Sequence, residues 1–186
     1  ARGLARLDGI VIAGTSGVTG AGAQGRKVDP MYLYTEANEN VQAYAVASHR
    51  HTPEIEQELS LLAGAPVRVG FTPHLVPLNR GLFTPASVPL ATAMSTGDLL
   101  AVYGEFYAGE PFVRVLDDGQ RPTTRAVVAS NYCDVSVVAD PRTGRAVCLS
   151  AIDNLGKGGS ANGVQVLNIL AGWLERTGLG AVPVYP

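Results

Sequence analysis

The sequence predicts an α+β fold: a mixed, mostly antiparallel sheet with helices packed on one face. Short apolar runs bounded by turn residues predict strands, and the turn at residues 140–144 predicts a hairpin. Three segments with apolar residues at helical spacing follow serine or threonine, which predicts three helices. Without tandem repeats or low-complexity segments, residues 1–186 are expected to form one domain.

Six segments have the pattern of strands. They are residues 9–13, 41–46, 67–71, 112–116, 134–139 and 145–152. Residues 9–13 are a continuous apolar run, which is typical of a buried strand. Val67, Val69 and Phe71 alternate with other residues, as in a half-buried strand. Four prolines within residues 72–90 predict short extended pieces and turns there, because proline cannot donate a hydrogen bond in a sheet.

Two of the helices have clear boundary residues. The first is expected to be capped by the Thr52 hydroxyl, with Pro53 at its first position and Gly64 as its end. The second is expected to be capped by Thr96 and to end before Gly109.

The third helix, over residues 164–174, follows Ser160 and is apolar on most faces, so we expect it to be buried. A glycine-rich turn at residues 152–159 precedes it, and such a turn favours binding of a polar or anionic group. A second glycine-rich loop, residues 14–22, presents amides that can cradle an anion. The alternative for residues 14–22 is a flexible connector.

Composition argues against several protein classes. A net charge of −2 without a basic run argues against nucleic-acid binding, and no apolar run reaches membrane-spanning length. Cys133 and Cys148 lack the spacing of a metal site or a disulfide framework, so we expect no metal and reduced thiols in a cytoplasmic protein. The first residue is not methionine, which suggests a fragment or a processed product.

Two of the three histidines lie in residues 47–54. In an extended segment His49 and His51 would point the same way, with Arg50 opposite. The positive field of the following helix start would keep a histidine there neutral and able to accept a proton. The alternative is a pair of surface histidines in a loop, and the isolated His74 is more typical of a hydrogen-bonded structural residue.

Seven segments match one known family in chain order. They are residues 16–22, 49–58, 71–77, 79–81, 110–113, 151–155 and 157–158. The chain resembles the C-terminal, substrate-binding and dimerisation part of the N-acetyl-gamma-glutamyl-phosphate reductases. The run His-Arg-His-Thr-Pro-Glu-Ile is specific to that family, which favours a catalytic His49 over a surface one. The implied fold is that of the substrate domain of glyceraldehyde-3-phosphate and aspartate-semialdehyde dehydrogenases.

The resemblance implies an activity and a set of site residues. The activity is NADPH-dependent reduction of an N-acetyl-glutamyl phosphate-type acyl phosphate to the semialdehyde through a cysteine thioester, in arginine biosynthesis. The resemblance implies that His49 is the catalytic residue. The implied substrate-binding residues are Arg50, His51, Arg80, Ser16 and Gly17. Asn154 and Gly158 are the implied NADP-binding residues. The planar guanidinium of Arg50 or Arg80 suits a carboxylate or a phosphate.

The chain departs from the family in three ways. The family's nucleophilic cysteine and nucleotide-binding glycine motif have no counterpart. We therefore expect an absent N-terminal dinucleotide-binding domain to hold most of NADP, and the chain alone to be inactive. Residues 23–25 look like an insertion, and Ala161 replaces a family glycine at the start of the last helix.

Two further expectations concern partners and alternatives. A homodimer or homotetramer is expected through the sheet face that the helices leave uncovered, unless a loop such as residues 72–90 covers it. The alternatives for function are a non-catalytic binding and dimerisation module, or a sibling reductase that acts on a carrier-linked aminoadipyl phosphate.

Overall fold

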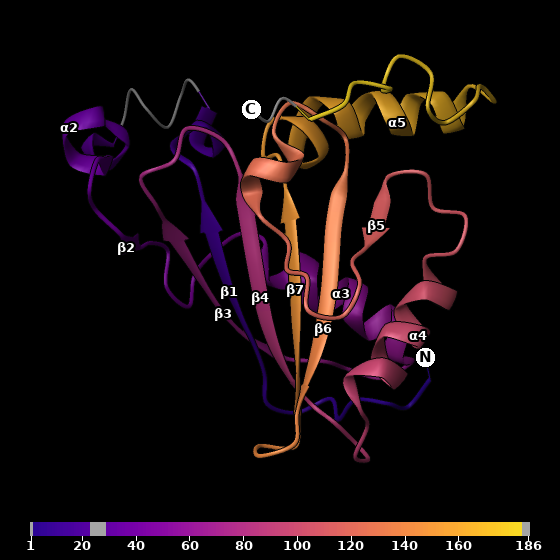
Figure 1. Ribbon diagram of the computed structural model, residues 1–186. Coiled ribbons are helices and arrows are strands. Elements are labelled where there is room, and N and C mark those ends of the chain that lie inside the picture. Colours follow the sequence, from indigo (N-terminus) through magenta and orange to yellow (C-terminus); the bar gives the residue numbers. More distant parts are fainter. Residues whose placement is uncertain (1, 23–28, 184–186) are drawn as a thin grey trace.

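The computed structural model describes residues 2–22 and 29–183, so the expected insertion at residues 23–25 lies outside the described residues. Within them, seven strands form one sheet in the order β2-β3-β1-β4-β7-β6-β5 (Figure 1). The strands are β1 (Ile10–Ser16), β2 (Gln42–Ala43), β3 (Val69–Leu75), β4 (Leu82–Pro89), β5 (Val113–Val115), β6 (Cys133–Asp140) and β7 (Arg145–Ile152). The α-helices are α2 (Tyr34–Ala37), α3 (Thr52–Ala63), α4 (Thr96–Phe106) and α5 (Ala161–Leu170).

The sheet is mixed and mostly antiparallel, as predicted. Two strand pairs, β1–β3 and β5–β6, are parallel, and the other four are antiparallel. The hairpin of β6 and β7 forms as expected: the Asp140 carboxylate accepts hydrogen bonds from the Arg142 amide and the Thr143 hydroxyl, and Gly144 has a φ of 65°. The strand expected over residues 41–46 is limited to the two residues of β2.

Helices α3 and α4 cover the same face of the sheet, which confirms the predicted arrangement. Leu59 of α3 packs on a cluster that includes Ile12, and Leu99 of α4 packs on a cluster that includes Val137. The strand register connects Ile12 to Val137 across β4 and β7, so both clusters lie on one face. Alternate residues of a strand point to opposite faces, and those between these core positions therefore point away from the helices.

The stretch of residues 72–90 differs from its prediction, because it contains the eight-residue strand β4 in the middle of the sheet. The ladder between β4 and β7 is continuous, whereas that between β1 and β4 skips Thr84 and Pro85. Pro85 has no N–H to donate, so the sheet accommodates it where the ladder to β1 is interrupted. This stretch is part of the sheet and does not cover it.

The uncovered face of the sheet is partly closed by a different segment. A turn of 3-10 helix, η3 (Thr124–Val127), lies against the start of β4 on that side (Figure 1). A Cβ on Gly81 would lie 2.7 Å from the Thr124 Cβ, so glycine is needed for this approach. Val11 on the same face stays 53% exposed, so the described residues leave the face open around it.

The helix caps are shifted by one residue from those predicted. His51 precedes α3, Thr52 is the first helical residue, and no side chain caps this end. Ser95 caps α4 in a reciprocal capping box, because its backbone is extended while Thr96 is already helical. Gly64 ends α3 in the left-handed conformation, as predicted.

Helix α5 is the largest departure from prediction. Its apolar side chains point outward, with Leu170 80% exposed and nearby Leu174 83% exposed, whereas Gln165 and Asn168 are buried. Gln165 accepts a hydrogen bond from Asn131 at 2.8 Å, and Asn168 donates to two backbone carbonyls that follow the helix. The polar side of α5 therefore faces the body of the molecule.

No helix among the described residues is long and apolar enough to cross a membrane.

Candidate functional site

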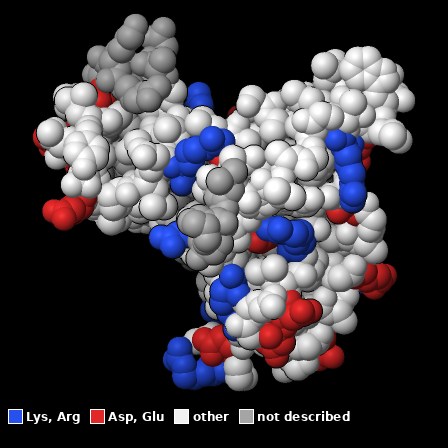
Figure 2. All heavy atoms as spheres, turned by 45° about the horizontal axis from the view of Figure 1, so that its top comes forward, with Lys and Arg blue, Asp and Glu red and all other residues white. Residues whose placement is uncertain are grey.

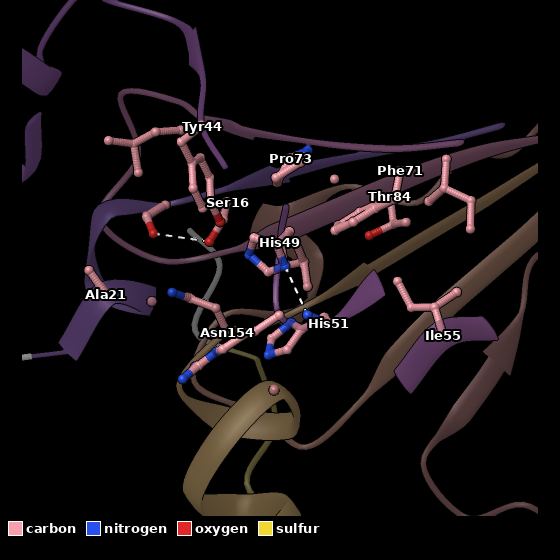
Figure 3. A pocket seen from close by; sticks show the side chains of 18 of the residues that line it. Ser16, Ala21, Tyr44, His49, His51, Ile55, Phe71, Pro73, Thr84 and Asn154 are labelled. Atoms are coloured by element: carbon pink, nitrogen blue, oxygen red, sulfur yellow. Dashed lines mark hydrogen bonds between the residues drawn. The ribbon is translucent and has the colours of Figure 1, made fainter. Parts of the chain in front are cut away.

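A pocket of about 790 Å³ lies where β1 and β3 end beside the start of α3 (Figure 3). Its floor includes Ile12 and Phe71, so it opens on the helix-covered face of the sheet. Of the eight site residues expected from the sequence, those that line it are Ser16, Gly17, His49, Arg50, His51, Asn154 and Gly158. The eighth, Arg80, lines a smaller cavity of about 240 Å³ instead.

His49 is held by aromatic rings and by one backbone hydrogen bond. Its ring centroid lies 5.5 Å from that of Tyr44, 5.4 Å from that of Phe71 and 4.8 Å from that of His51, all in edge-to-face orientation. The His51 backbone N–H donates to His49 Nδ1 at 3.2 Å (Figure 3). Since Nδ1 accepts, a neutral His49 carries its proton on Nε2, and Nε2 remains for chemistry.

The surroundings of His49 lower its pKa. Burial is the largest cause, nearby His51 and Arg50 act in the same direction, and Glu54 opposes them. The direction agrees with the neutral histidine expected from the sequence, but burial matters more than any field at the helix start. The backbone of His51 is helical rather than extended, and Arg50 lines the pocket instead of pointing away from it.

The glycine-rich loop after β1 is bound to the segment before β4. The amide of Gly17 donates to the Gly81 carbonyl at 2.9 Å, and that of Val18 to the Leu78 carbonyl at 2.9 Å. A Cβ on Gly17 would lie 2.8 Å from the Leu78 oxygen, so this position requires glycine. These amides are therefore engaged within the protein, and Gly17 shapes the wall while the Ser16 side chain reaches the pocket (Figure 3).

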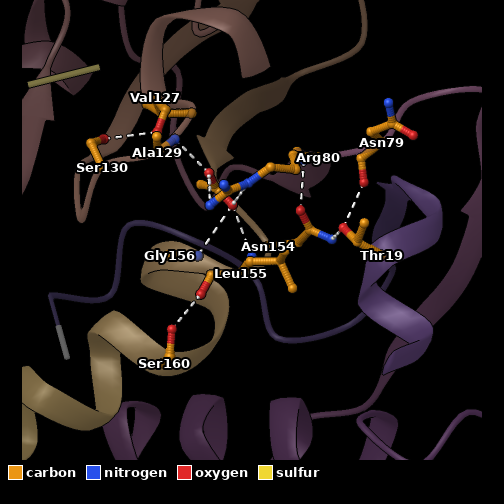
Figure 4. Close-up of polar contacts among 12 residues, drawn as sticks. Thr19, Asn79, Arg80, Val127, Ala129, Ser130, Asn154, Leu155, Gly156 and Ser160 are labelled. Carbon is orange, nitrogen blue, oxygen red and sulfur yellow. Dashed lines mark hydrogen bonds and ion pairs between the residues drawn. The ribbon is translucent and has the colours of Figure 1, made fainter. Parts of the chain in front are cut away.

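Asn154 connects three segments at the edge of the pocket. Its Oδ1 accepts from the Gly81 amide at 2.7 Å, and its Nδ2 donates to the Thr19 hydroxyl at 2.9 Å (Figure 4). Gly158 lines the pocket within η4 (Gly156–Ser160), a π-helical turn that leads into α5. The glycine-rich turn predicted before the last helix thus borders the same pocket as His49.

Arg80 is committed to an ion pair outside the pocket. Its Nη2 lies 2.8 Å from Oδ2 of Asp153, and its side chain is 36% exposed while that of Asp153 is fully buried. Burial alone would raise the pKa of Asp153, but hydrogen bonds from three backbone amides and from Arg80 outweigh it, so the pKa is lowered. In this geometry Arg80 stabilises the strand end that carries Asn154.

Neither cysteine belongs to the pocket. Burial, followed by the charge of Asp134, raises the pKa of Cys133 to about 11, and burial raises that of Cys148. Such thiols stay protonated near neutral pH and are poor nucleophiles. His74 also lies outside the pocket, in β3. Its Nδ1 is buried without a hydrogen-bond partner among the described residues, which differs from the hydrogen-bonded structural residue expected.

Four pocket residues with polar side chains were not selected from the sequence. They are Tyr32, Tyr44, Glu54 and Thr84. Glu54 lies three residues after His51, and this proximity in the sequence is the one signal that could have pointed to it. Tyr44 lies shortly before His49 in the chain, whereas Tyr32 belongs to the 3-10 turn η2 (Pro30–Tyr32) and Thr84 to β4, so only the tertiary structure brings the three to one pocket.

Comparison with known proteins places this geometry in a family context. The family model described as "Semialdehyde dehydrogenase, dimerisation domain" matches residues 1–154. The N-acetyl-gamma-glutamyl-phosphate reductase of Geobacter sp. (strain M21) is 51% identical over 178 residues, which are 95% of this chain and 51% of that protein. The reductase of the same name from Symbiobacterium thermophilum is 50% identical over 186 residues, or 99% of this chain and 53% of that protein.

The chain thus spans about half the length of the curated relatives it matches. Among solved structures, aspartate semialdehyde dehydrogenase II complexed with ASA from Vibrio cholerae has a similar fold, with a TM-score of 0.67 at 16% identity. That match covers 87% of this chain and 54% of the other. From its match to the family model over most of its length, the chain belongs to the semialdehyde dehydrogenase dimerisation domain family.

Proposed function

We propose that this chain supplies the catalytic histidine and the substrate pocket of an N-acetyl-gamma-glutamyl-phosphate reductase of arginine biosynthesis. The reaction is the NADPH-dependent reduction of an acyl phosphate to the semialdehyde. The observation that carries this proposal is His49, a neutral histidine with Nε2 available in a pocket of about 790 Å³. The chain's identity of about half its residues to reductases of that name supports the substrate class.

His49 is proposed to move the protons of this reaction. A thiolate attacks the acyl carbon, a sulfur–carbon bond forms, the carbon–oxygen bond to phosphate breaks, and inorganic phosphate leaves. NADPH, when bound, supplies a hydride to the resulting thioester carbon. His49 acts through Nε2. In the tautomer that the His51 N–H favours, Nε2–H supports the oxygen that gains charge in the second half, after which the carbon–sulfur bond breaks and releases the aldehyde and the thiolate. Taking the thiol proton at Nε2 in the first half requires the other tautomer, with the proton on Nδ1, in which the hydrogen bond from His51 is given up. Such proton transfer is worth about 10² to 10⁴ in rate.

Arg50 and Ser16 are proposed to bind the substrate. Arg50 lines the pocket and forms no ion pair with any described residue, so its guanidinium can accept a carboxylate or a phosphate. The hydroxyl of Ser16 and the ring of His51 add polar groups to the same wall. Gly17 contributes shape, and Arg80 is proposed to act through Asp153 and not by touching the substrate.

The residues near η4 fit a nicotinamide cofactor. Among the described residues, one N–H of the Asn154 amide has no acceptor, so it can donate to a carboxamide. Gly158 has no side chain, so its backbone stays uncovered at the pocket edge. A Cβ at this position would lie 3.3 Å from the backbone oxygen of Asp153. We propose that Asn154 and Gly158 hold this end of NADP and that the other half of the polypeptide holds the rest.

The thiol is proposed to come from that other half. Both cysteines of this chain are outside the pocket and have raised pKa values. The relatives are about twice as long as this chain, which leaves room for a domain that carries both the nucleophile and the dinucleotide site. The chain alone is then expected to bind NADP weakly and to be inactive.

The outward apolar side of α5 is the proposed contact with that half. It carries Val166, Ile169 and Leu170, and the helix contains no charged residue. Figure 2 shows an almost uncharged surface where α5 lies. Because α5 follows the η4 turn at the pocket edge, a domain seated on it lies beside His49. Exposed apolar patches of this kind are typical of interfaces.

Self-association is proposed through the uncovered face of the sheet, as a homodimer or a homotetramer. Val11, Val147 and Val138 lie in one row across the sheet on that face. Like faces pair about two-fold axes in most homo-oligomers. A cytoplasmic location agrees with two free thiols.

The test is reductase activity of a polypeptide that joins this chain to the other half of a relative. NADPH oxidation should depend on N-acetyl-glutamyl phosphate, and His49→Ala should lower kcat by about 10² or more. His51→Ala is the comparison, and it should retain most of the turnover. A fully active His49→Ala protein with an inactive His51→Ala protein means that His51 is catalytic.

The substrate separates the alternatives. Reduction of a carrier-linked aminoadipyl phosphate alone favours the sibling reductase. No reduction of that compound or of N-acetyl-glutamyl phosphate favours a binding and dimerisation module.

A further inference from the structure

Asp153 is fully buried and accepts hydrogen bonds on both carboxylate oxygens. Its Oδ1 accepts from the amides of Leu155 at 2.8 Å and Gly156 at 3.1 Å. Its Oδ2 accepts from the amide of Ala129 at 2.6 Å and lies 2.8 Å from Nη2 of Arg80 (Figure 4). A buried carboxylate is tolerated because each of these donors compensates for lost water, so its removal leaves several groups unpaired at once.

These donors come from two loops that approach each other closely. Ala129 has a φ of 61°, a left-handed conformation that is unfavourable for a residue with a Cβ, and its amide is the one that reaches Asp153. A Cβ on Gly156 would lie 2.3 Å from the Ser130 oxygen, so the backbone of η4 rests directly on this loop. The Asp153 carboxylate is the group common to both loops and to Arg80.

On its other side, the same strand end borders the pocket. Asn154, the next residue, lines the pocket and binds Gly81 and Thr19. Gly158 also lines the pocket, and its amide donates to the Asp153 carbonyl at 2.9 Å. Asp153 itself does not line the pocket.

We propose that Asp153 is a positioning residue for the pocket: its carboxylate fixes the strand end and η4, and thereby sets where Asn154 and Gly158 stand. Arg80 serves the same purpose, since it precedes Gly81, the residue whose amide donates to Asn154. The expected effect of Asp153 on kcat rests on the function proposed above. Its expected effect on the local structure concerns this chain alone.

The structural test is amide hydrogen exchange of the 186-residue chain with Asp153→Asn. Asparagine keeps the shape but loses the charge and replaces one acceptor oxygen with a donor. We expect the Gly81 amide, which donates to Asn154, to exchange about tenfold faster or more under conditions where the chain is folded.

Asp134→Asn is the matched control. Asp134 is also buried and paired with an arginine, with Arg114 Nε 2.6 Å from its Oδ1, but it lines neither cavity. The Asp134→Asn substitution should lower the global stability of the chain without a comparable effect on hydrogen exchange of the Gly81 amide. Unchanged Gly81 exchange in Asp153→Asn, or equal acceleration in both variants, would overturn the proposal.

The kinetic test uses the joined polypeptide described above. Asp153→Asn should lower kcat by about 10², the loss expected for a displacement of about 1 Å, with the KM for the acyl phosphate little changed. Asp134→Asn should keep the parent kcat. If Asp153→Asn also keeps it in an active parent, Asp153 does not position the pocket. If the parent has no reductase activity, the proposed function fails, and the exchange comparison still decides on Asp153.

Arg80→Met provides a second variant if Asp153→Asn does not fold. It removes the ion pair but leaves the three backbone donors of Asp153 in place. Gly81 exchange should accelerate in the same direction by a smaller factor. Parent-like exchange in Arg80→Met would overturn the proposal.

Discussion

At the scale of single residues, the site depends on what holds each side chain. His49 is oriented by three rings and by the N–H of His51, and the same contacts disfavour its charged form. Protonation of Nδ1 would place a donor against the donating amide of His51, so the hydrogen bond favours the neutral ring. The environment thus selects both the protonation state and the reactive nitrogen.

The pH dependence of the joined enzyme tests this arrangement. Because burial, His51 and Arg50 lower the pKa of His49, it should become protonated only below the ordinary histidine pKa of about 6.5. The acid limb of kcat/KM should therefore lie below about pH 6.5. Glu54→Gln removes the group that raises this pKa, so the limb should move to still lower pH. A limb above about pH 6.5 that Glu54→Gln leaves in place would contradict this assignment.

At the scale of secondary-structure elements, α5 shows how tertiary contacts select the face of a helix. Gln165 and Asn168 satisfy groups of the body of the molecule, so the apolar side chains of the helix point outward. Burying them requires a further surface, because a single leucine gains about 1.5 to 3 kcal/mol when it leaves water. The helix is therefore better suited to a domain interface than to the core of this chain.

Substitution of the most exposed apolar positions tests that interface. Leu170→Ser should weaken binding of this chain to the other half of a relative, supplied as a separate polypeptide, by about tenfold or more, since about 1.4 kcal/mol is a factor of ten. Isothermal titration calorimetry measures the change. Leu61→Ser is the control, because Leu61 is also exposed, at 71%, but lies on α3. Equal effects of the two substitutions would argue against a contact through α5.

At the scale of the whole molecule, the two faces of the sheet differ. One face carries α3, α4 and the pocket, and the other is covered only in part by η3 (Figure 1). A stable interface buries about 800 Å² on each partner, and the open part of this face, with Val11, Val147 and Val138 in one row, is where such an interface is proposed. The proposed catalytic pocket and the proposed association face thereby lie on opposite sides of one sheet.

Sedimentation of this chain at micromolar concentration should show a dimer or a larger oligomer. Val11→Lys should shift it toward the monomer, because a charge in the middle of an apolar interface is costly to bury. Val11 is already 53% exposed in the single chain, so the substitution should leave the fold intact. Leu62→Lys, at a position that is 55% exposed on α3, should have no effect on association. A monomeric parent chain would mean that η3 and its neighbours cover the face sufficiently.

Local patterns were sufficient for most elements and for part of the site. Apolar runs and turn residues predicted β1, β6 and β7, and the histidine run with Pro53 predicted the start of α3 within one residue. These features depend on neighbours in the chain, so short-range chemistry decides them. The same run carried the resemblance that pointed to His49.

Long-range contacts decided what local patterns could not. Pro85 lies in a central strand because the sheet tolerates an interrupted ladder beside β1, and Arg80 turns to Asp153 because a buried carboxylate needs a cation. The outward apolar face of α5 follows from polar partners elsewhere in the chain, which helical periodicity cannot reveal. The sequence by itself determined β1, β6, β7, the hairpin and the candidate histidine. The tertiary structure decided which polar groups are buried and which apolar faces remain open, because each outcome depends on partners distant along the chain.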